Sequence, residues 1–353
     1  MKTITLIEHL FRYGDWAHDR LFALCDGLSD EQLDQPREMG FGSLRATLFH
    51  IYAAEQIWYE RWTGVPWRPF PFDPQGTPLS AIADGLRDVA RQRTTLIDAE
   101  RESDWQRIVS YKDSKQVDYQ LPLGELLLHV GNHGIHHRAQ ALHFLKSFGR
   151  TVPGGLDYLF FRLAQPTVAQ DDSVNESLRG FGLEVNTTAG VGVEFERDRQ
   201  KRYFEYSDWA NTIVIELADK LSNEQLDHDF GMGVGSIRKT LLHMFDAEAW
   251  WANAWETGPS AMEHLPVETT IAELRDRWHD LIGRRNRFLS GLDQSGADRI
   301  ITVIVGEMHC RFQVFESTIQ LCGHGTHHRA QLVNMLRRSG AAVRNIDYLY
   351  FLA

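Results

Sequence analysis

The sequence is poor in cysteine and in long apolar runs. It holds three cysteines in 353 residues, Cys25, Cys310 and Cys322. So few cysteines, odd in number, argue against a disulfide framework and are typical of a reducing compartment. No run of about 18 uncharged apolar residues is present, which argues against a transmembrane helix. Glu8 and His9 come too early for a secretory signal. We therefore expect a cytoplasmic protein with no membrane partner.

Positive charge is also scarce. Lysine and arginine together count 37 against 48 aspartates and glutamates, which gives a formal net charge of −11. The basic residues are scattered along the chain, so they indicate neither a nucleic-acid partner nor an anionic membrane surface. Apolar residues make up 43% of the chain and charged residues 24%. This composition is typical of globular proteins, and the length suffices for two domains.

An internal duplication is the main feature that the sequence does contain. The segment "DWAHDRLFALCDGLSDEQLDQ" from Asp15 matches "DWANTIVIELADKLSNEQLDH" from Asp208, an offset of 208 − 15 = 193 residues. At the same offset "GSLRATLFHIYAAEQIWYERW" matches "GSIRKTLLHMFDAEAWWANAW". Further on, "HGIHHRAQ" matches "HGTHHRAQ", and "LDYLFF" matches "IDYLYF". Such self-similarity indicates two copies of one domain.

The limits of the repeats predict the domain organisation. We place the first domain at residues 1–165 and the second at 198–353. The intervening residues 166–197 are polar, rich in glycine and without clear periodicity, which is typical of a linker.

Each copy is predicted to be rich in helix. Apolar residues recur at spacings of three and four. Ser43 and Ser236 each follow a glycine and are suitable N-caps for the second helix of their copy. A third helix is expected over 78–102 and again over 268–292. The runs "QRIVSYKDSKQVDYQL" and "RIITVIVGEMHCRFQVF" are typical of hairpins or extended connections. We predict a mainly α fold of two four-helix bundles, each with a short β-hairpin-like connection.

Four pairs of histidines occupy matching positions in the two copies: His50 with His243, His133 with His324, His136 with His327, and His137 with His328. His133 and His137 are four residues apart, so their side chains project from one helix face about 5–6 Å apart. This spacing suits two imidazoles that bind one metal, and His50 is the only shared candidate for a third ligand. Three histidines leave a tetrahedral metal one open position, as in catalytic sites. His129 extends the same face, but its counterpart is Gln320, so a site common to both copies cannot require it.

Other residues of the motif have two interpretations each. His136 and His327, three residues after the first histidine, are alternatives to the i+4 ligand or its hydrogen-bond partners; we favour the i+4 pair. Gly134 and Gly325 follow the first histidine, so the motif is not H-E-x-x-H and provides no zincin general base. A glycine within a helix costs about 1 kcal/mol relative to alanine. Its recurrence indicates either close approach of substrate or another backbone, or tight helix packing.

These residues resemble the DinB/YfiT-like superfamily of metal-binding four-helix bundles. The resemblance rests on "TLFHIYAAEQIWYERW" and "HGIHHRAQ" in one copy, and on "TLLHMFDAEAWWANAW" and "HGTHHRAQ" in the other. In that family one histidine of the second helix and an H-x-x-x-H pair of a later helix bind a divalent metal. The resemblance implies two ligand sets: His50, His133 and His137 in the first copy, and His243, His324 and His328 in the second.

The resemblance also implies a class of function. Some members are thiol-dependent transferases or isomerases that use low-molecular-weight thiols, and others are described as metal-dependent hydrolases. We expect a metal-dependent enzyme in which a divalent transition metal, Zn or Ni, activates water or a thiol for attack on a small-molecule substrate. The alternatives are a non-catalytic metal-binding or stress-response binding module, and a scaffold for protein association. Because family members often pair, the two halves are expected to pack together as an intramolecular pseudo-dimer.

Two shared carboxylates lie near the proposed ligands in the sequence. Glu55 and Glu248 follow the helix-two histidine by five residues, which places them about 140° around the helix from it. This angle argues against ligation. A role in supporting the ligands or as a general base stays open, but we favour a solvated or paired structural glutamate. The shared tryptophans of the same helix are more typical of a core or an interface than of a substrate wall; they are Trp58, Trp62, Trp251 and Trp255.

The arginine of the motif, Arg138 or Arg329, also recurs. A guanidinium suits an anionic substrate, which it can bind through two hydrogen bonds. We favour instead a structural tie to Asp157 and Asp347 in the shared "DYL" segment. The glutamine that ends the motif has no predicted role.

Overall fold

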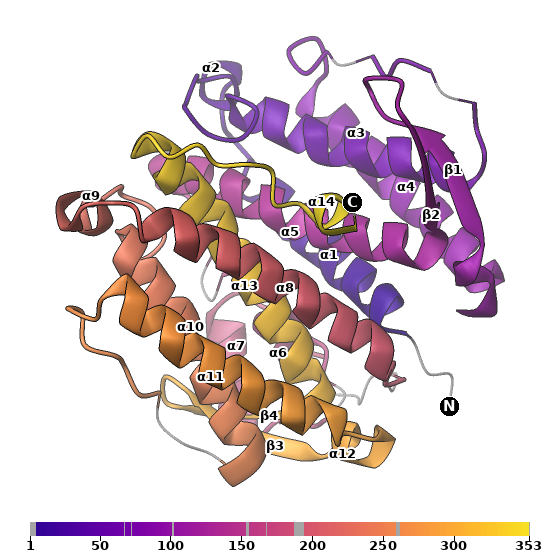
Figure 1. The fold of residues 1–353 in the computed structure, drawn as a ribbon. Helices are drawn as coiled ribbons and strands as arrows, with labels where there is room; N and C mark the ends of the chain where they lie inside the picture. Colours follow the sequence, from indigo (N-terminus) through magenta and orange to yellow (C-terminus); the bar gives the residue numbers. More distant parts are fainter. Residues whose placement is uncertain are drawn as a thin grey trace. The chain divides into compact units, whose positions relative to one another are not determined.

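The computed structural model of the chain divides into two compact units. It describes residues 5–66, 68–71, 73–100, 102–152, 155–166, 168–186, 194–258 and 262–352. The first-repeat unit comprises Ile7–Thr151 and Asp347–Ala353, and the second-repeat unit comprises Val152–Ile346 and Met1–Leu6. Both units are mainly helical, as the sequence predicts, and each contains one small antiparallel hairpin (Figure 1).

Four long helices form the first-repeat unit: α1 (Leu6–Ala23), α3 (Leu44–Trp62), α4 (Leu79–Ala99) and α5 (Leu123–Ser147). The shorter elements are α2 (Asp30–Leu33), the 3-10 helix η1 (Glu102–Gln106), β1 (Ile108–Lys112), β2 (Asp118–Pro122) and α14 (Tyr348–Leu352). The apolar faces of the long helices meet in one core. It includes Phe11 of α1, Trp58 and Trp62 of α3, Ile97 of α4 and Leu126 of α5. The tryptophan stripe of α3 is therefore part of the core.

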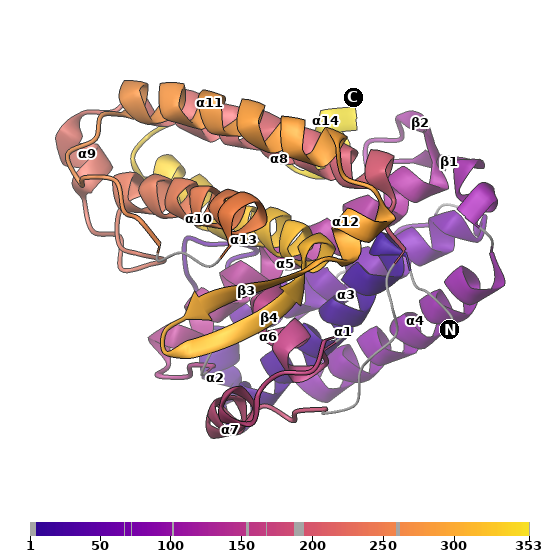
Figure 2. The same ribbon diagram turned by 90° about the horizontal axis from the view of Figure 1, so that it is seen from below.

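The second-repeat unit has the same four long helices: α8 (Arg197–Ala218), α10 (Ile237–Thr257), α11 (Ile271–Ser290) and α13 (Val314–Arg338). Its shorter elements are α6 (Tyr158–Ala164), α7 (Asp172–Gly180), α9 (Asn223–Asp227), α12 (Gln294–Asp298), β3 (Ile300–Val305) and β4 (Met308–Gln313). Figure 2 shows α8 lying along α11, and α10 along α13. Trp251 and Trp255 of α10 are buried.

The local sequence explains where the second helix of each copy begins. The Ser43 hydroxyl accepts a hydrogen bond from the Ala46 N–H at 3.2 Å. The Ser236 hydroxyl accepts one from the Lys239 N–H at 3.3 Å. Both serines thus satisfy a backbone donor that the first helical turn leaves free, and both predicted N-caps are confirmed.

The two β-rich runs form antiparallel hairpins. In the first, Ile108 pairs with Pro122 and Lys112 with Asp118. In the second, β3 and β4 pair from Ile300 opposite Gln313. Each hairpin leads directly into the helix that carries the "HHRAQ" motif, because β2 ends where α5 begins and β4 ends where α13 begins.

Each unit also contains a short helix whose sequence belongs to the other copy. The "LDYLFF" segment of the first copy forms α6 in the second-repeat unit. There Arg162 Nη2 donates to Glu316 Oε1 at 2.6 Å, with both side chains buried. The "IDYLYF" segment of the second copy forms α14 in the first-repeat unit, where it lies against α5 (Figure 1). Leu349 of α14 packs on the first-repeat core.

Part of the segment predicted as a linker is helical. Within 166–197, α7 buries Val174 and Leu178, and Leu183 beyond it is also buried. These apolar side chains explain why the segment packs on the second-repeat unit despite its polar composition. The domain boundaries at 165 and 198 themselves stay a prediction. In the described part of the chain, no helix is long and apolar enough to cross a membrane.

Candidate metal centres

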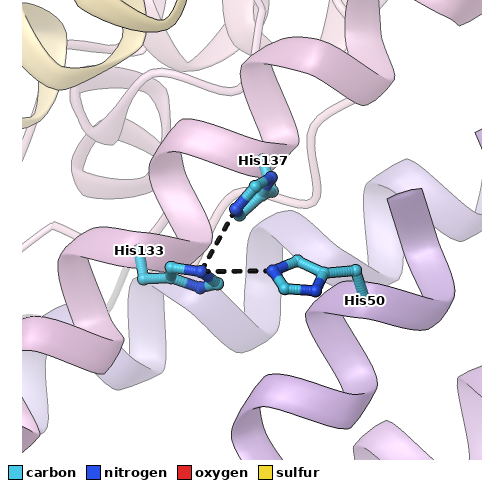
Figure 3. A group of neighbouring side chains, drawn as sticks. All are labelled: His50, His133 and His137. Carbon is cyan, nitrogen blue, oxygen red and sulfur yellow. Dashed lines mark hydrogen bonds between the residues drawn. The ribbon is translucent and has the colours of Figure 1, made fainter. Parts of the chain in front are cut away.

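The three proposed ligands of the first copy converge in the first-repeat unit. His50 projects from α3, and His133 and His137 project from α5 (Figure 3). The Nε2 atom of His133 lies 3.3 Å from that of His50 and 3.1 Å from that of His137. One nitrogen of each ring therefore faces a common point, and all three lie within 4.8 Å of one another. Helix α5 brings its two histidines together by the i, i+4 spacing, and α3 supplies the third.

The second-repeat unit repeats this arrangement. The Nε2 atom of His324 lies 3.1 Å from that of His243 and 3.1 Å from that of His328. Helix α10 carries His243, and α13 carries the other two. Both predicted triads are thus brought together by the fold. The geometry can present three imidazole nitrogens to one divalent cation.

Burial keeps these imidazoles neutral. It lowers the pKa of His50 to about 3, with the charge of His137 as the next cause. Burial also holds the pKa of His133 and of His137 well below its ordinary value. In the second triad the pKa values of His324 and His328 are likewise lowered well below the ordinary value. Neutral rings are the protonation state that a metal requires of histidine ligands.

A glutamine orients one ligand in each triad. His137 Nδ1 lies 2.8 Å from Gln140 Oε1, and His328 Nδ1 lies 2.9 Å from Gln331 Oε1. A carbonyl oxygen only accepts, so Nδ1 carries the proton and the Nε2 lone pair faces the other histidines. The sequence alone predicts no role for these glutamines. Their recurrence three residues after the ligand was the available signal.

The same glutamine contacts His136 in the first unit and its counterpart His327 in the second, the two histidines whose role as ligand or as hydrogen-bond partner was open. Gln140 Nε2 lies 3.1 Å from His136 Nε2, and in the other unit Gln331 Nε2 lies 2.9 Å from His327 Nε2. An amide NH₂ donates, so each of these histidines accepts a hydrogen bond through its Nε2 atom. They belong to neither triad. They support the ligands through the glutamine.

A glycine loop before the second helix closes over each glutamine. Gly40 has φ +53°, and a Cβ atom built on it would lie 2.8 Å from Gln140 Oε1. Gly233 has φ +55°, and its Cβ would lie 2.4 Å from Gln331 Oε1. Both the left-handed backbone and the close approach require glycine. The loop also places Phe41 on His50, with the two rings stacked 3.8 Å apart. The repeated "MGFGS" and "MGVGS" strings were the sequence signal for this loop.

The glycine within the motif lies against closely packed side chains, which fits the prediction of tight helix packing. A Cβ on Gly134 would lie 2.8 Å from Arg138 Nη1, and one on Gly325 would lie 2.9 Å from Arg329 Nη1. The glycine thus makes room for the buried guanidinium of its own helix. The other nearby atoms are side chains of the neighbouring helix: His18 Nε2 lies 3.8 Å from the Gly134 position, and Ser207 Oγ lies 3.5 Å from the Gly325 position.

The arginine itself is structural, but its predicted partners are wrong. Arg138 Nη1 lies 3.2 Å from His18 Nε2. Arg329 Nη1 donates to Ser207 Oγ and Asn211 Oδ1, each at 2.9 Å. The aspartates expected as partners belong to α6 and α14 segments that fold into the other unit, so the sequence order was misleading.

The shared glutamate is part of a buried ion cluster. In the first-repeat unit Arg93 of α4 pairs with Glu55 of α3 and, at 2.6 Å, with Asp15 of α1. In the second, Arg285 pairs with Glu248 and, at 2.6 Å, with Asp208. The cluster ties three helices together. The structure therefore favours the paired structural role for both glutamates.

A pocket of about 640 Å³ opens beside the first triad. His50 lies at its wall, together with apolar side chains such as Ile57 and Phe70. Arg61 also lines it, and among the described residues no carboxylate lies within salt-bridge distance of this guanidinium. The Arg61 side chain donates to the Lys112 backbone oxygen at 2.9 Å. At the equivalent positions of the second copy, Trp250 replaces Ile57, and an alanine replaces the arginine.

A carboxylate that the sequence analysis did not connect with the triad also reaches the first site. Asp347 Oδ1 lies 3.0 Å from His129 Nδ1, and Oδ2 lies 3.8 Å from His133 Nε2. Burial alone would raise the pKa of Asp347, but His129 beside it holds this pKa well below the ordinary value. No sequence signal places a residue of the second copy here.

The chain belongs to the DinB family, whose sequence pattern matches residues 1–172 and again 196–353. The resemblance seen in the sequence is thereby confirmed, as are two tandem copies. No curated protein and no solved structure matches the chain at a significant level.

Proposed function

We propose that this chain is a metal-dependent enzyme with a divalent transition metal, Zn or Ni, at the two histidine triads. The observation that carries the proposal is the convergence of three neutral imidazole nitrogens in each unit. This donor set fits either ion, and three protein ligands leave a position open. A bound metal would lower the pKa of water to about 7 and so supply a nucleophile near neutral pH.

The chain's own residues prepare the site for this chemistry. Gln140 holds the proton of His137 on Nδ1, so its other nitrogen is free to bind the metal. Phe41 stacks on the His50 ring. The pocket beside His50 offers space for a small molecule, and the Arg61 guanidinium lines it. These features support hydrolysis or group transfer on a small, anionic substrate, with water or a low-molecular-weight thiol as the nucleophile.

Metal stoichiometry tests the proposal. Protein purified without chelator is expected to carry about two transition-metal ions per chain, one for each triad. The double variant His137→Ala and His328→Ala should lose both ions, because each triad loses an i+4 ligand. A matched control replaces His143 and His279, which lie in neither triad, with alanine. Wild-type protein with less than about half an equivalent of metal would contradict the proposal.

Turnover separates an enzyme from a binding module. The metal-loaded protein is assayed with a panel of esters and electrophiles, with and without low-molecular-weight thiols. Turnover that disappears in the triad variant, and persists in the control variant, supports the enzyme. Stoichiometric metal without turnover of any substrate favours the non-catalytic module. The cytoplasmic location, the lack of a nucleic-acid partner and the pseudo-dimer stay predictions.

A further inference from the structure

The exchanged C-terminal segment brings a carboxylate to the first metal centre. Asp347 directly precedes α14, which belongs to the first-repeat unit although the second copy encodes it. Two contacts anchor the segment there. The Tyr348 hydroxyl donates to Glu125 Oε2 at 2.6 Å, and Leu349 packs on the core. The position of the Asp347 side chain is therefore set by the fold of the unit.

The Asp347 carboxylate lies close to one ligand of the first triad. Its Oδ2 lies 3.8 Å from His133 Nε2, the nitrogen that both His50 and His137 approach within 3.3 Å. Its Oδ1 lies 3.0 Å from His129 Nδ1. Oδ1 also accepts a hydrogen bond from the Tyr348 backbone N–H at 2.6 Å. One oxygen is thus held at the start of α14 beside a histidine outside the triad, and the other lies close to the ligand His133.

The negative charge of the carboxylate would strengthen metal binding at this centre. Three neutral imidazoles contribute no negative charge to a divalent cation in a largely buried site. An anionic oxygen a few ångströms away stabilises such a cation strongly, because the attraction is weakly screened there. Carboxylates that contact or hold metal ligands typically change metal affinity 10- to 100-fold.

The second centre differs at the position of His129, the histidine beside the carboxylate. Gln320 replaces His129, and its Oε1 accepts a hydrogen bond from the Leu159 backbone at 2.8 Å. The equivalent aspartate, Asp157, also comes from the other copy's "DYL" segment. Burial lowers the pKa values of His243 and His328, and the negative charge of Asp157 acts on both in the opposite direction. Within the described residues, however, no hydrogen bond or ion pair holds this carboxylate.

We propose that the Asp347 carboxylate stabilises a divalent metal at the first centre. The second copy supplies this residue, and the carboxylate lies beside His129 and His133. The two centres of the chain are then unequal. The first, with three histidines and a fixed carboxylate, binds a divalent metal more tightly than the second. The inference rests on the proposed metal sites and adds to them a fourth protein group and a difference in affinity.

Zinc competition titrations on the full chain test this inference. Metal-free wild-type protein is titrated against a chromophoric chelator, and two binding events of different affinity are expected. Asp347→Asn should weaken the tighter event about 10-fold or more, because the carboxylate charge is lost. The matched control Asp157→Asn should leave that event unchanged. Absorption of the Co²⁺-substituted protein should change at the tight site in the first variant only.

A second variant tests whether weaker metal binding comes from the loss of α14 packing and not from the loss of the carboxylate. Tyr348→Phe removes the hydrogen bond to Glu125 but keeps the Asp347 carboxylate, so it should retain the tight event. Equal weakening by Tyr348→Phe and Asp347→Asn would overturn the inference, since the loss would then come from the docking of α14. Unchanged affinity in Asp347→Asn would overturn it as well. Wild-type protein that binds neither zinc nor nickel would instead refute the proposed function itself.

Discussion

Single residues around the triads act mainly by orienting the ligands. Gln140 fixes the proton of His137, and Gly40 lets the loop before α3 approach that glutamine. The spacing of the histidines predicted which rings would meet, because i and i+4 share a helix face. It could not predict the glutamine contact, which depends on side-chain rotamers, nor the loop, which lies far from the motif in sequence.

Replacement of Gly40 tests the role of this loop. Gly40→Ala should destabilise the protein by about 1–2 kcal/mol, because alanine is strained in the left-handed region. It should also weaken metal binding, since the new Cβ would displace the Gln140 oxygen that holds His137. Urea unfolding and zinc titration measure the two effects. Gly42→Ala is the control, because φ there is +87° and no atom lies within 4 Å of its Cβ. Equal metal affinity in both variants would show that the contact with Gln140 is unimportant.

At the scale of elements, a buried ion cluster links α1, α3 and α4. Arg93 pairs with Asp15 and Glu55, and the same triangle recurs around Arg285 in the other unit. The position of Glu55 on its helix indicated that it was no ligand. Its partner on α4 was not predictable, because the two residues are 38 positions apart in sequence and meet only when the helices pack.

The cluster predicts an unusual pH dependence of stability. Burial raises the pKa of Glu55 from its ordinary 4.5 to about 6, while Arg93 acts in the opposite direction. The folded carboxyl then binds a proton more readily than the unfolded one. Its contribution to stability is present below about pH 4.5 and is lost as the pH rises to about 6. The loss is on the order of 1–2 kcal/mol.

Urea unfolding of wild type and Glu55→Gln at pH 4.5 and pH 6.5 measures this effect. The variant should be less stable at both values because Arg93 loses a partner, but its stability should fall less between them. Asp88→Asn, which removes an exposed carboxylate, serves as the control and should keep the wild-type pH dependence. An identical pH dependence in Glu55→Gln would refute the shift.

At the scale of the whole molecule, the units do not follow the order of the repeats. The second-repeat unit contains α6, whose Arg162 pairs with the buried Glu316 of α13. A fragment that starts at residue 198 therefore retains the second copy but lacks part of its unit.

Fragments of the second copy test this organisation. The fragment 198–353 leaves Glu316 without Arg162, and breaking a buried ion pair typically costs about 3–5 kcal/mol. It should unfold at a clearly lower urea concentration than the fragment 152–353, as followed by circular dichroism. The matched variant Arg162→Met in the longer fragment should show much of the same loss. Equal midpoints for the two fragments would mean that α6 does not belong to this unit.

The sequence by itself determined the duplication, the four long helices of each copy, the hairpins and the paired histidines. Each of these depends on periodicity within one element or on comparison of the two copies, and both are properties of the linear chain. Only the tertiary structure decided which segments complete each unit and which carboxylate reaches the first triad. Tyr348 and Glu125 are 223 positions apart. A contact at that distance depends on how two surfaces pack, and no local pattern in the sequence records it.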